Sequence, residues 1–256
     1  MRNRNTLQFA GGYFSSEWPF LLAKIARAVH YSSMNTGIRY VPLVVFLFIW
    51  SVPLFAQDKP DALKSYRIGR DLEAQGRLND ANVRYDEAVQ ICKQEISENS
   101  TNMDSYTVLT WALLRQKKYS EVIEWAQKGL KINPSDYRII ETMGEAYFYL
   151  NEYSLCLKYM QKYIDAAPQA ERVSVAYFFM GEVYRISQKY NHADIAYSTA
   201  VKLEPNLPIW WYRLGSVREA LGDYAGSLSA YQQALKLNPS YREASDGAER
   251  VKKRLG

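Results

Sequence analysis

The chain has 256 residues, of which 48% are hydrophobic, which is enough for one or two domains with a buried core. Its formal net charge of +5 would suit a nucleic-acid-binding protein, but the excess is concentrated near the N-terminus. Residues 1–56 hold five basic residues and one acidic residue, which leaves 27 basic and 26 acidic residues in the rest of the chain. We therefore expect no nucleic-acid partner for the region after residue 56.

A single continuous apolar run, Val41–Phe55, lies near the N-terminus. As a helix its 15 residues would reach about 23 Å, which is short of the roughly 30 Å hydrocarbon core of a membrane. Pro42 and Pro53 would weaken such a helix further. The run is more typical of a secretory signal peptide, with Arg39 before it and cleavage after Ala56. An uncleaved membrane anchor is the alternative.

The residues before this run fit poorly in front of a signal peptide. A chain that begins at Met34 would have a normal leader, so we interpret residues 34–56 as a signal peptide or a short membrane anchor. Residues 1–33 are then an extension upstream of the true start; the alternative is a genuine amphipathic extension. Residues 57–61 read as a polar linker. We therefore expect an exported protein that is periplasmic or associated with the cell envelope.

From residue 62 onward, the same order of residue types recurs along the chain. The best-formed unit, residues 174–207, contains in order Tyr177, Met180, Gly181, Tyr184, Ala193, Tyr197, Ala200 and Pro205. Residues 208–241 repeat the order with Trp211, Leu214, Gly215, Tyr224, Tyr231, Ala234 and Pro239. The two prolines lie 34 residues apart. On these residues the chain resembles the tetratricopeptide repeat family over roughly its last 195 residues.

The resemblance implies an all-α, right-handed α-solenoid in which each repeat is a pair of antiparallel helices. Over the domain 62–256, five repeats are expected near residues 62–95, 103–136, 137–170, 174–207 and 208–241. The second repeat is the most divergent, because Thr110 replaces the usual glycine and Leu113 the usual aromatic residue. The junction around residues 169–173 is three residues longer than the period predicts. A helix over 241–255 is expected to cap the open end of the last repeat.

Each repeat should close where its two helices approach each other. We expect the glycine of the first helix to face the small residue twelve positions later, with aromatic residues filling the remaining gaps. The expected pairs are Gly69 with Ala81, Gly144 with Cys156, Gly181 with Ala193, and Gly215 with Ser227. We also expect Arg218 to lie under the capping helix, with its aliphatic part packed and its guanidinium group in water.

Residues suited to catalysis are scarce. The two histidines, His30 and His192, have no placed nucleophile or carboxylate partner, and no phosphate-binding loop or metalloprotease motif occurs. Cys156 occupies a packing position, and Cys92 lies two repeats away, so a disulfide between them is not expected. We therefore expect no catalytic, cofactor-binding or metal-binding residue, no cofactor, and no enzymatic activity.

The resemblance also places a binding groove. In the family, first helices line the concave face, and their non-packing positions contact ligands. Carried over by position, the candidate groove residues are Tyr66, Arg70, Trp111, Leu114, Arg115, Arg138, Glu141, Glu145, Phe148, Tyr149, Phe178, Glu182, Arg185 and Tyr212. An alternative for Trp111, Phe148 and Phe178 is that they pack between neighbouring first helices.

We therefore expect a protein–protein interaction scaffold that binds an extended peptide or a helix of another protein in this groove. The family's carboxylate clamp for chaperone C-termini is not expected, because its asparagine positions hold Arg70, Thr110 or Trp111, and Glu145. Partner specificity is expected in the second repeat, at Trp111 and Arg115. The alternatives are a membrane-anchored assembly factor of the cell envelope, if residues 41–56 are not cleaved, and a small-ligand or lipid carrier.

Overall fold

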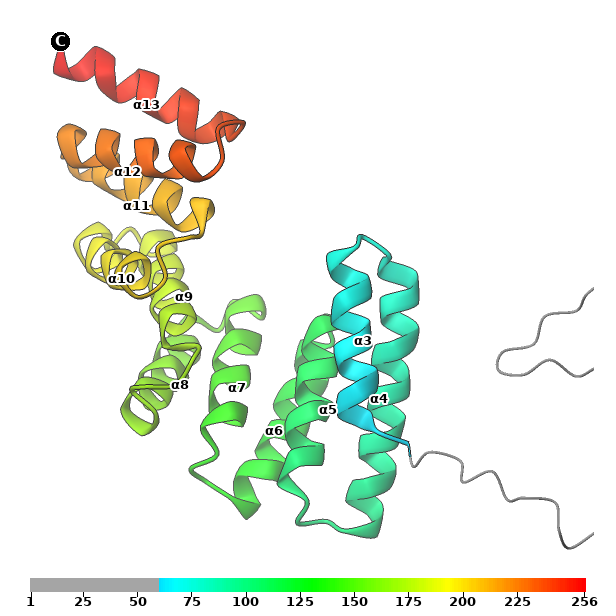
Figure 1. Cartoon of the computed structure of the whole chain (residues 1–256). Coiled ribbons are helices and arrows are strands. Elements are labelled where there is room, and N and C mark those ends of the chain that lie inside the picture. Colours follow the sequence, from blue (N-terminus) through cyan, green and yellow to red (C-terminus); the bar gives the residue numbers. More distant parts are fainter. Residues whose placement is uncertain (1–59) are drawn as a thin grey trace, which may run out of the picture. The chain divides into compact units, whose positions relative to one another are not determined.

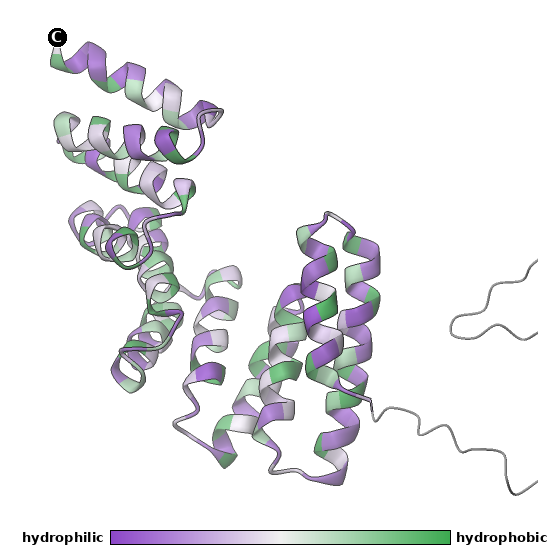
Figure 2. Cartoon of the chain, viewed as in Figure 1, coloured by the Kyte–Doolittle hydropathy of each residue, from purple (hydrophilic) through white to green (hydrophobic). Residues whose placement is uncertain are grey.

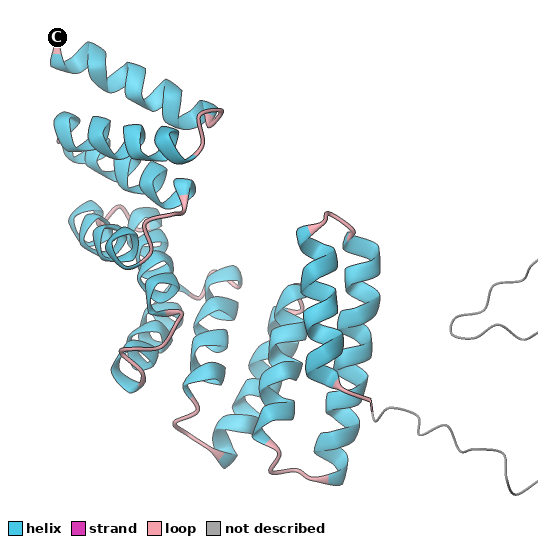
Figure 3. Ribbon diagram, in the orientation of Figure 1, coloured by secondary structure: helices cyan, strands magenta, loops and turns pink. Residues whose placement is uncertain are grey.

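The structure, a computed structural model, describes residues 60–256. The expected extension (1–33), the signal peptide or anchor (34–56) and linker residues 57–59 lie outside the described residues. Residues 60–256 contain eleven α-helices and no strand, which confirms the expected all-α class (Figures 1 and 3). None of these helices combines the length and the hydropathy that a membrane-spanning segment requires.

The helices form five antiparallel pairs followed by a single helix. The first helices of the pairs are α3 (Ala62–Ala74), α5 (Met103–Arg115), α7 (Tyr137–Tyr149), α9 (Val173–Ile186) and α11 (Pro208–Leu221). The second helices are α4 (Leu78–Glu98), α6 (Tyr119–Ile132), α8 (Tyr153–Ala166), α10 (Tyr190–Leu203) and α12 (Tyr224–Leu237), and α13 (Arg242–Leu255) follows. Each helix packs on the next along the chain, and α3, α5, α7 and α9 also contact one another in order, as in a solenoid.

Local sequence signals set the helix ends. Side chains at four N-caps, Asp61, Asn102, Asp136 and Asp223, accept hydrogen bonds from backbone N–H groups of the following turn. Prolines lie two residues after the last residue of four second helices, at Pro134, Pro168, Pro205 and Pro239. Hydrophobic and hydrophilic residues alternate along the helices (Figure 2), as expected of helices that bury one face.

The glycines in the first helices let the two helices of a pair approach each other. The side chain that fills the space at Gly181 and Gly215 is mainly a tyrosine rather than the expected small residue. A Cβ atom added at Gly181 would lie 2.7 Å from ring carbons of Tyr197, sixteen positions later, and Gly215 stands in the same relation to Tyr231. The residue twelve positions later also faces the glycine backbone in the fifth pair, where the Ser227 hydroxyl donates to the Gly215 carbonyl at 2.8 Å. The two positions differ by about one helical turn, so both face the glycine, and the larger side chain fills the space.

The last helix, α13, covers the end of the array as expected of a cap. Its buried Gly247 lies against Tyr231, whose ring is therefore enclosed between Gly215 and Gly247. Arg250 of α13 donates two hydrogen bonds, each of 3.0 Å, to Glu219 of α11. The expectation for Arg218 was wrong. Its guanidinium group points back to α10, because Asp194 and Ser198 supply acceptors there at 2.8 Å and 3.1 Å.

The turn within each pair uses a left-handed backbone conformation at one position. The residues there, with their φ angles, are Gly76 (76°), Lys117 (60°), Asn151 (63°), Gln188 (55°) and Gly222 (80°). Glycine adopts this conformation without a Cβ penalty, and asparagine tolerates it better than most residues. Lys117 and Gln188 therefore store backbone strain at exposed positions.

We expect Lys117→Gly and Gln188→Gly each to raise the free energy of unfolding by about 1 kcal/mol, because glycine removes this strain. Urea denaturation followed by circular dichroism measures the change. Ser187→Gly is the matched control, since Ser187 has a φ of −79° and gains nothing from the substitution. A loss of stability in both turn variants would contradict the prediction.

Candidate functional site

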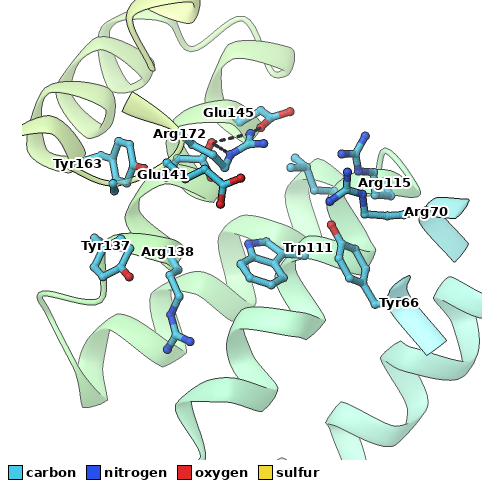
Figure 4. Close-up of a pocket in the computed structure, with 13 residues that line it drawn as sticks. Tyr66, Arg70, Trp111, Arg115, Tyr137, Arg138, Glu141, Glu145, Tyr163 and Arg172 are labelled. Carbon is cyan, nitrogen blue, oxygen red and sulfur yellow. Dashed lines mark hydrogen bonds and ion pairs between the residues drawn. The ribbon is translucent and has the colours of Figure 1, made fainter. Parts of the chain in front are cut away.

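A pocket of about 430 Å³ lies between the first helices α3, α5 and α7 and the loop that joins α8 to α9 (Figure 4). We call it the first-helix pocket. It is lined by Tyr66, Arg70, Trp111, Leu114, Arg115, Tyr137, Arg138, Glu141, Glu145, Tyr163, Ala170, Glu171 and Arg172. The long junction after the third pair supplies the last three of these residues.

The pocket gathers eight of the fourteen candidate groove residues. These eight are Tyr66, Arg70, Trp111, Leu114, Arg115, Arg138, Glu141 and Glu145. The other six, Phe148, Tyr149, Phe178, Glu182, Arg185 and Tyr212, do not line it. Residues that the sequence reasoning missed are Tyr137, Tyr163, Ala170, Glu171 and Arg172. The extra length of the junction was the one signal that could have pointed to Arg172.

Aromatic side chains form one surface of the pocket. The rings of Tyr66 on α3 and Trp111 on α5 have centroids 5.7 Å apart and an interplanar angle of 35°. Tyr66 is buried, whereas Trp111 and its neighbour Leu114 are half-buried. An apolar side chain from a ligand could therefore contact Trp111 and Leu114, and the Tyr66 ring packs against Trp111.

Two arginines lie at the end of the pocket formed by α3 and α5. Arg115 lies 3.9 Å from the carboxylate of Glu73, at the outer limit of an ion pair. The second oxygen of Glu73 already accepts a 2.6 Å hydrogen bond from the Tyr85 hydroxyl. Within residues 60–256, no carboxylate lies at ion-pair distance from Arg70. Among the described residues, this end of the pocket therefore holds one arginine without an ion pair and one with a single long ion pair.

Two glutamates on α7 share one arginine across the pocket. The Nη2 atom of Arg172 lies 2.8 Å from Glu141 and 3.0 Å from Glu145, and its Nε atom donates to Glu141 at 3.0 Å (Figure 4). The side chains of Glu141 and Glu145 are only 5% and 15% exposed. Glu141 and Glu145 lie four positions apart on one helix, so their charges repel each other on the same face.

Burial controls the protonation of this pair. It raises the pKa of Glu141 above its usual range, an effect that Arg172 partly offsets. Burial and the neighbouring charge of Glu141 raise the pKa of Glu145 to about 7. Near neutral pH the pair therefore carries less than two full negative charges, and Arg172 neutralises most of what remains.

A second pocket, of about 460 Å³, adjoins the first, because both are lined by Trp111 and Arg138. Arg138 is fixed by acidic partners on both sides, with 2.9 Å contacts to Asp136 and to Asp104. The second pocket lies toward the N-terminal ends of α3 and α5. We call the two adjoining pockets together the groove.

The remaining candidate residues mainly hold helices together. Phe178 stacks on Trp210 of α11 with centroids 5.0 Å apart, and Phe148 meets Phe179 edge to face at 5.1 Å. Glu182 is buried and accepts hydrogen bonds from Arg185 and from the Tyr197 hydroxyl. Tyr212 packs near Tyr231 and Tyr241, while Tyr149 stacks on Tyr119 at 4.8 Å and stays 45% exposed. Phe148 and Phe178 thus take the inter-helix packing role that was their alternative.

The described part of the chain offers little for chemistry. Cys92 and Cys156 are free and buried, and burial raises the pKa of each thiol to about 12. His192 is exposed and lies beside the ring of Tyr184, at 5.2 Å. Residues 60–256 contain no cluster of histidine, cysteine, aspartate or glutamate side chains that could hold a metal ion.

Family models match the C-terminal part of the chain. Residues 174–207 and 208–241 each match a tetratricopeptide repeat. A TPR repeat-containing protein, MJ1428 of Methanocaldococcus jannaschii, is 24% identical over 159 residues, which cover 61% of this chain and 27% of that protein. The mouse protein O-mannosyl-transferase TMTC1 is 22% identical over 172 residues, which cover 66% of this chain and 15% of the transferase. The chain thus spans about a quarter or less of these relatives' length.

Solved structures share the fold. A MamA double mutant superposes with a TM-score of 0.56 and 19% identity over 70% of this chain and 95% of its own. TTC0263, described as a thermophilic TPR protein of Thermus thermophilus, has a TM-score of 0.55 and 18% identity, and the match covers 75% of this chain and 98% of TTC0263. YrrB, described as a TPR protein with an unusual peptide-binding site, has a TM-score of 0.50 and 17% identity, and the match covers 75% of this chain and 94% of YrrB. The recurring residue order, the stacked helix pairs and these matches together show that the chain contains tetratricopeptide repeats, two of them at residues 174–207 and 208–241.

Proposed function

We propose that this protein binds an extended segment of another protein along the first-helix pocket and the pocket that adjoins it. The repeat fold supports a role as a protein–protein interaction scaffold. The observation that carries the proposal is the groove, in which the half-buried Trp111 and Leu114 lie beside Arg70 and Arg115. Aromatic residues and arginines are the usual anchors of protein interfaces.

The lining of the groove favours a peptide over a lipid. Seven of the thirteen residues around the first-helix pocket are charged, which is unsuited to an acyl chain but suited to a peptide with polar groups. The related fold of YrrB, whose description mentions a peptide-binding site, supports the same choice. A membrane-anchored assembly factor would use the same groove, and its expected anchor, residues 41–56, lies outside the described residues.

A photocrosslinking amino acid at Leu114 tests the proposal in cells that produce the full-length protein. We expect it to crosslink a protein partner, because Leu114 lines the pocket and is half-buried. The same amino acid at Val83, which is 65% exposed on α4 and lines neither pocket, is the matched control. Trp111→Ala should reduce capture roughly tenfold, as expected for loss of a central aromatic anchor.

Arg115→Gln guards against a folding defect, because it changes the groove without opening the aromatic packing around Tyr66. Circular dichroism of each variant checks that the helices are retained. Equal capture from positions 114 and 83, or full capture in both groove variants, would contradict binding in this groove.

A further inference from the structure

We infer that the bound segment carries an anionic side chain, a carboxylate or a phosphate, which binds between Arg70 and Arg115 beside Tyr66. The inference rests on the proposed function and adds the chemistry of the ligand. Figure 4 shows both guanidinium groups and the Tyr66 hydroxyl at the same end of the first-helix pocket. The site is thus formed by α3 and α5 together.

Charge pairing separates this end of the pocket from the rest. Of the four arginines that line the pocket, Arg138 is held by Asp136 and Asp104, and Arg172 is held by two glutamates. Arg70 and Arg115 have no comparable partner in residues 60–256. The nearest carboxylate to Arg115, at 3.9 Å, already accepts the hydrogen bond of a tyrosine.

The donor groups match an oxyanion. Each guanidinium group is a planar fork of N–H donors that fits a carboxylate or a phosphate, and charge-assisted hydrogen bonds of this kind are about twice as strong as neutral ones. Arg115 is 37% exposed and has Glu73 at 3.9 Å, so its guanidinium group remains open to a ligand. The rigid plane of a guanidinium group limits the side-chain entropy that is lost for each hydrogen bond formed.

The nearby negative charges do not block an anion. Across the pocket, Glu145 is bound by Arg172 at 3.0 Å, and burial keeps its pKa high. Glu73, which does not line the pocket, accepts a hydrogen bond from Tyr85 of α4. An anion that binds Arg115 therefore competes with one weak internal ion pair.

The aromatic surface adds a second element to the recognised segment. Trp111 lies 5.7 Å from Tyr66 and is half-buried, so a side chain next to the anion would contact it. We therefore expect the segment to hold an acidic or phosphorylated residue directly beside an aromatic or aliphatic one. Neutral segments with the same apolar residue should bind more weakly.

Three amidated, acetylated pentapeptides test the inference on the full-length protein. They are Asn-Glu-Phe-Asn-Gln, Asn-phosphoserine-Phe-Asn-Gln and the neutral Asn-Gln-Phe-Asn-Gln. We expect the Glu or phosphoserine peptide to bind roughly tenfold tighter than the neutral peptide at low salt, and the difference to shrink as salt is added. Tighter binding of one charged peptide than of the other identifies the source of the anion.

Two variants give the decisive comparison. The double variant Arg70→Gln with Arg115→Gln should remove the preference for the charged peptides. Lys64→Gln, which removes one positive charge at an exposed position of α3 that lines neither pocket, should keep this preference. Equal binding of all three peptides, or a preference that survives in the double variant, would overturn the inference. If either of these results is found while position 114 still crosslinks a protein partner, binding in the groove is retained and only the anion site is rejected.

Discussion

The Arg172→Met variant should lose about 2–3 kcal/mol of folding free energy at pH 8. Removal of the arginine leaves Glu141 and Glu145 buried beside each other without a counter-ion. Breaking a fully buried ion pair costs about 3–5 kcal/mol. The smaller figure applies because the Arg172 side chain itself is 44% exposed, so solvent screens part of the interaction.

The loss should depend on pH in a defined direction. A carboxyl group whose pKa is raised by folding keeps its proton in the folded state after the unfolded chain has released it. Stability from such a group is therefore present below the unfolded pKa, near 4, and is lost as pH rises toward the folded pKa, which is about 7 for Glu145. Without Arg172 the folded pKa values rise further, so the variant keeps losing stability above pH 7.

Urea denaturation of the wild type and of Arg172→Met at pH 5 and pH 8 measures this effect. We expect the difference between the two proteins to be small at pH 5, where protonation removes much of the negative charge, and largest at pH 8. Glu145→Gln should make the pH dependence of the wild type shallower, since it removes one of the two carboxyl groups whose pKa is raised. Arg250→Met is the matched control, because it breaks an exposed ion pair that contributes about 0.5 kcal/mol. An equal loss for Arg172→Met at both pH values would contradict the prediction.

Gly181→Ala should lower the free energy of unfolding by about 2 kcal/mol, although alanine is the better helix former by about 1 kcal/mol. The added Cβ would lie 2.7 Å from the ring of Tyr197, which is fully buried and bonded through its hydroxyl to Glu182. The ring can move away only by breaking that hydrogen bond and disturbing the stacked helices.

A double-mutant cycle with Tyr197→Leu isolates this contact. The shorter side chain removes the ring from the path of the new methyl group, so the two changes together should cost less than their sum. Ser229→Ala, at an exposed position of α12, is the control for helix propensity and should change stability little. Thermal denaturation measures the stability of the wild type, the two single variants and the double variant. If the losses of the two single variants simply add in the double variant, the contact between the Cβ atom and the ring does not limit the packing.

The repeat pattern was a sound guide to the fold because its information is local. A glycine, a small residue and a proline at fixed offsets within one unit specify a close helix pair and its end, as in residues 174–207. The pattern was less accurate about contacts. It paired Gly181 with Ala193, whereas the space at Gly181 is filled by Tyr197, because two residues one turn apart face the same glycine and size decides which of them fills it.

Part of the candidate site could also be predicted, because some of its residues occupy repeat positions. Positions on first helices follow the repeat, so Tyr66, Trp111 and Arg115 could be placed in a groove from their offsets alone, and they do line one pocket. Phe178 has an equivalent position, yet its ring stacks on Trp210 of α11 and lies beside Tyr197 of α10, so packing between helices occupies it. Arg172 follows no repeat position, since it lies in the extra length of the junction between α8 and α9.

The helix pairs and the capping helix could be predicted from the sequence, because each depends on spacing within about 34 residues. Which charges are neutralised depends instead on contacts between helices that are distant in the sequence. Arg70 and Arg172 are equivalent as residue types, but Arg172 reaches a glutamate 31 positions away, while Arg70 has no such partner in residues 60–256. The difference arises from distances between side chains on separate helices. These distances set the burial and protonation of Glu145, and they decide which arginines remain available to bind a ligand.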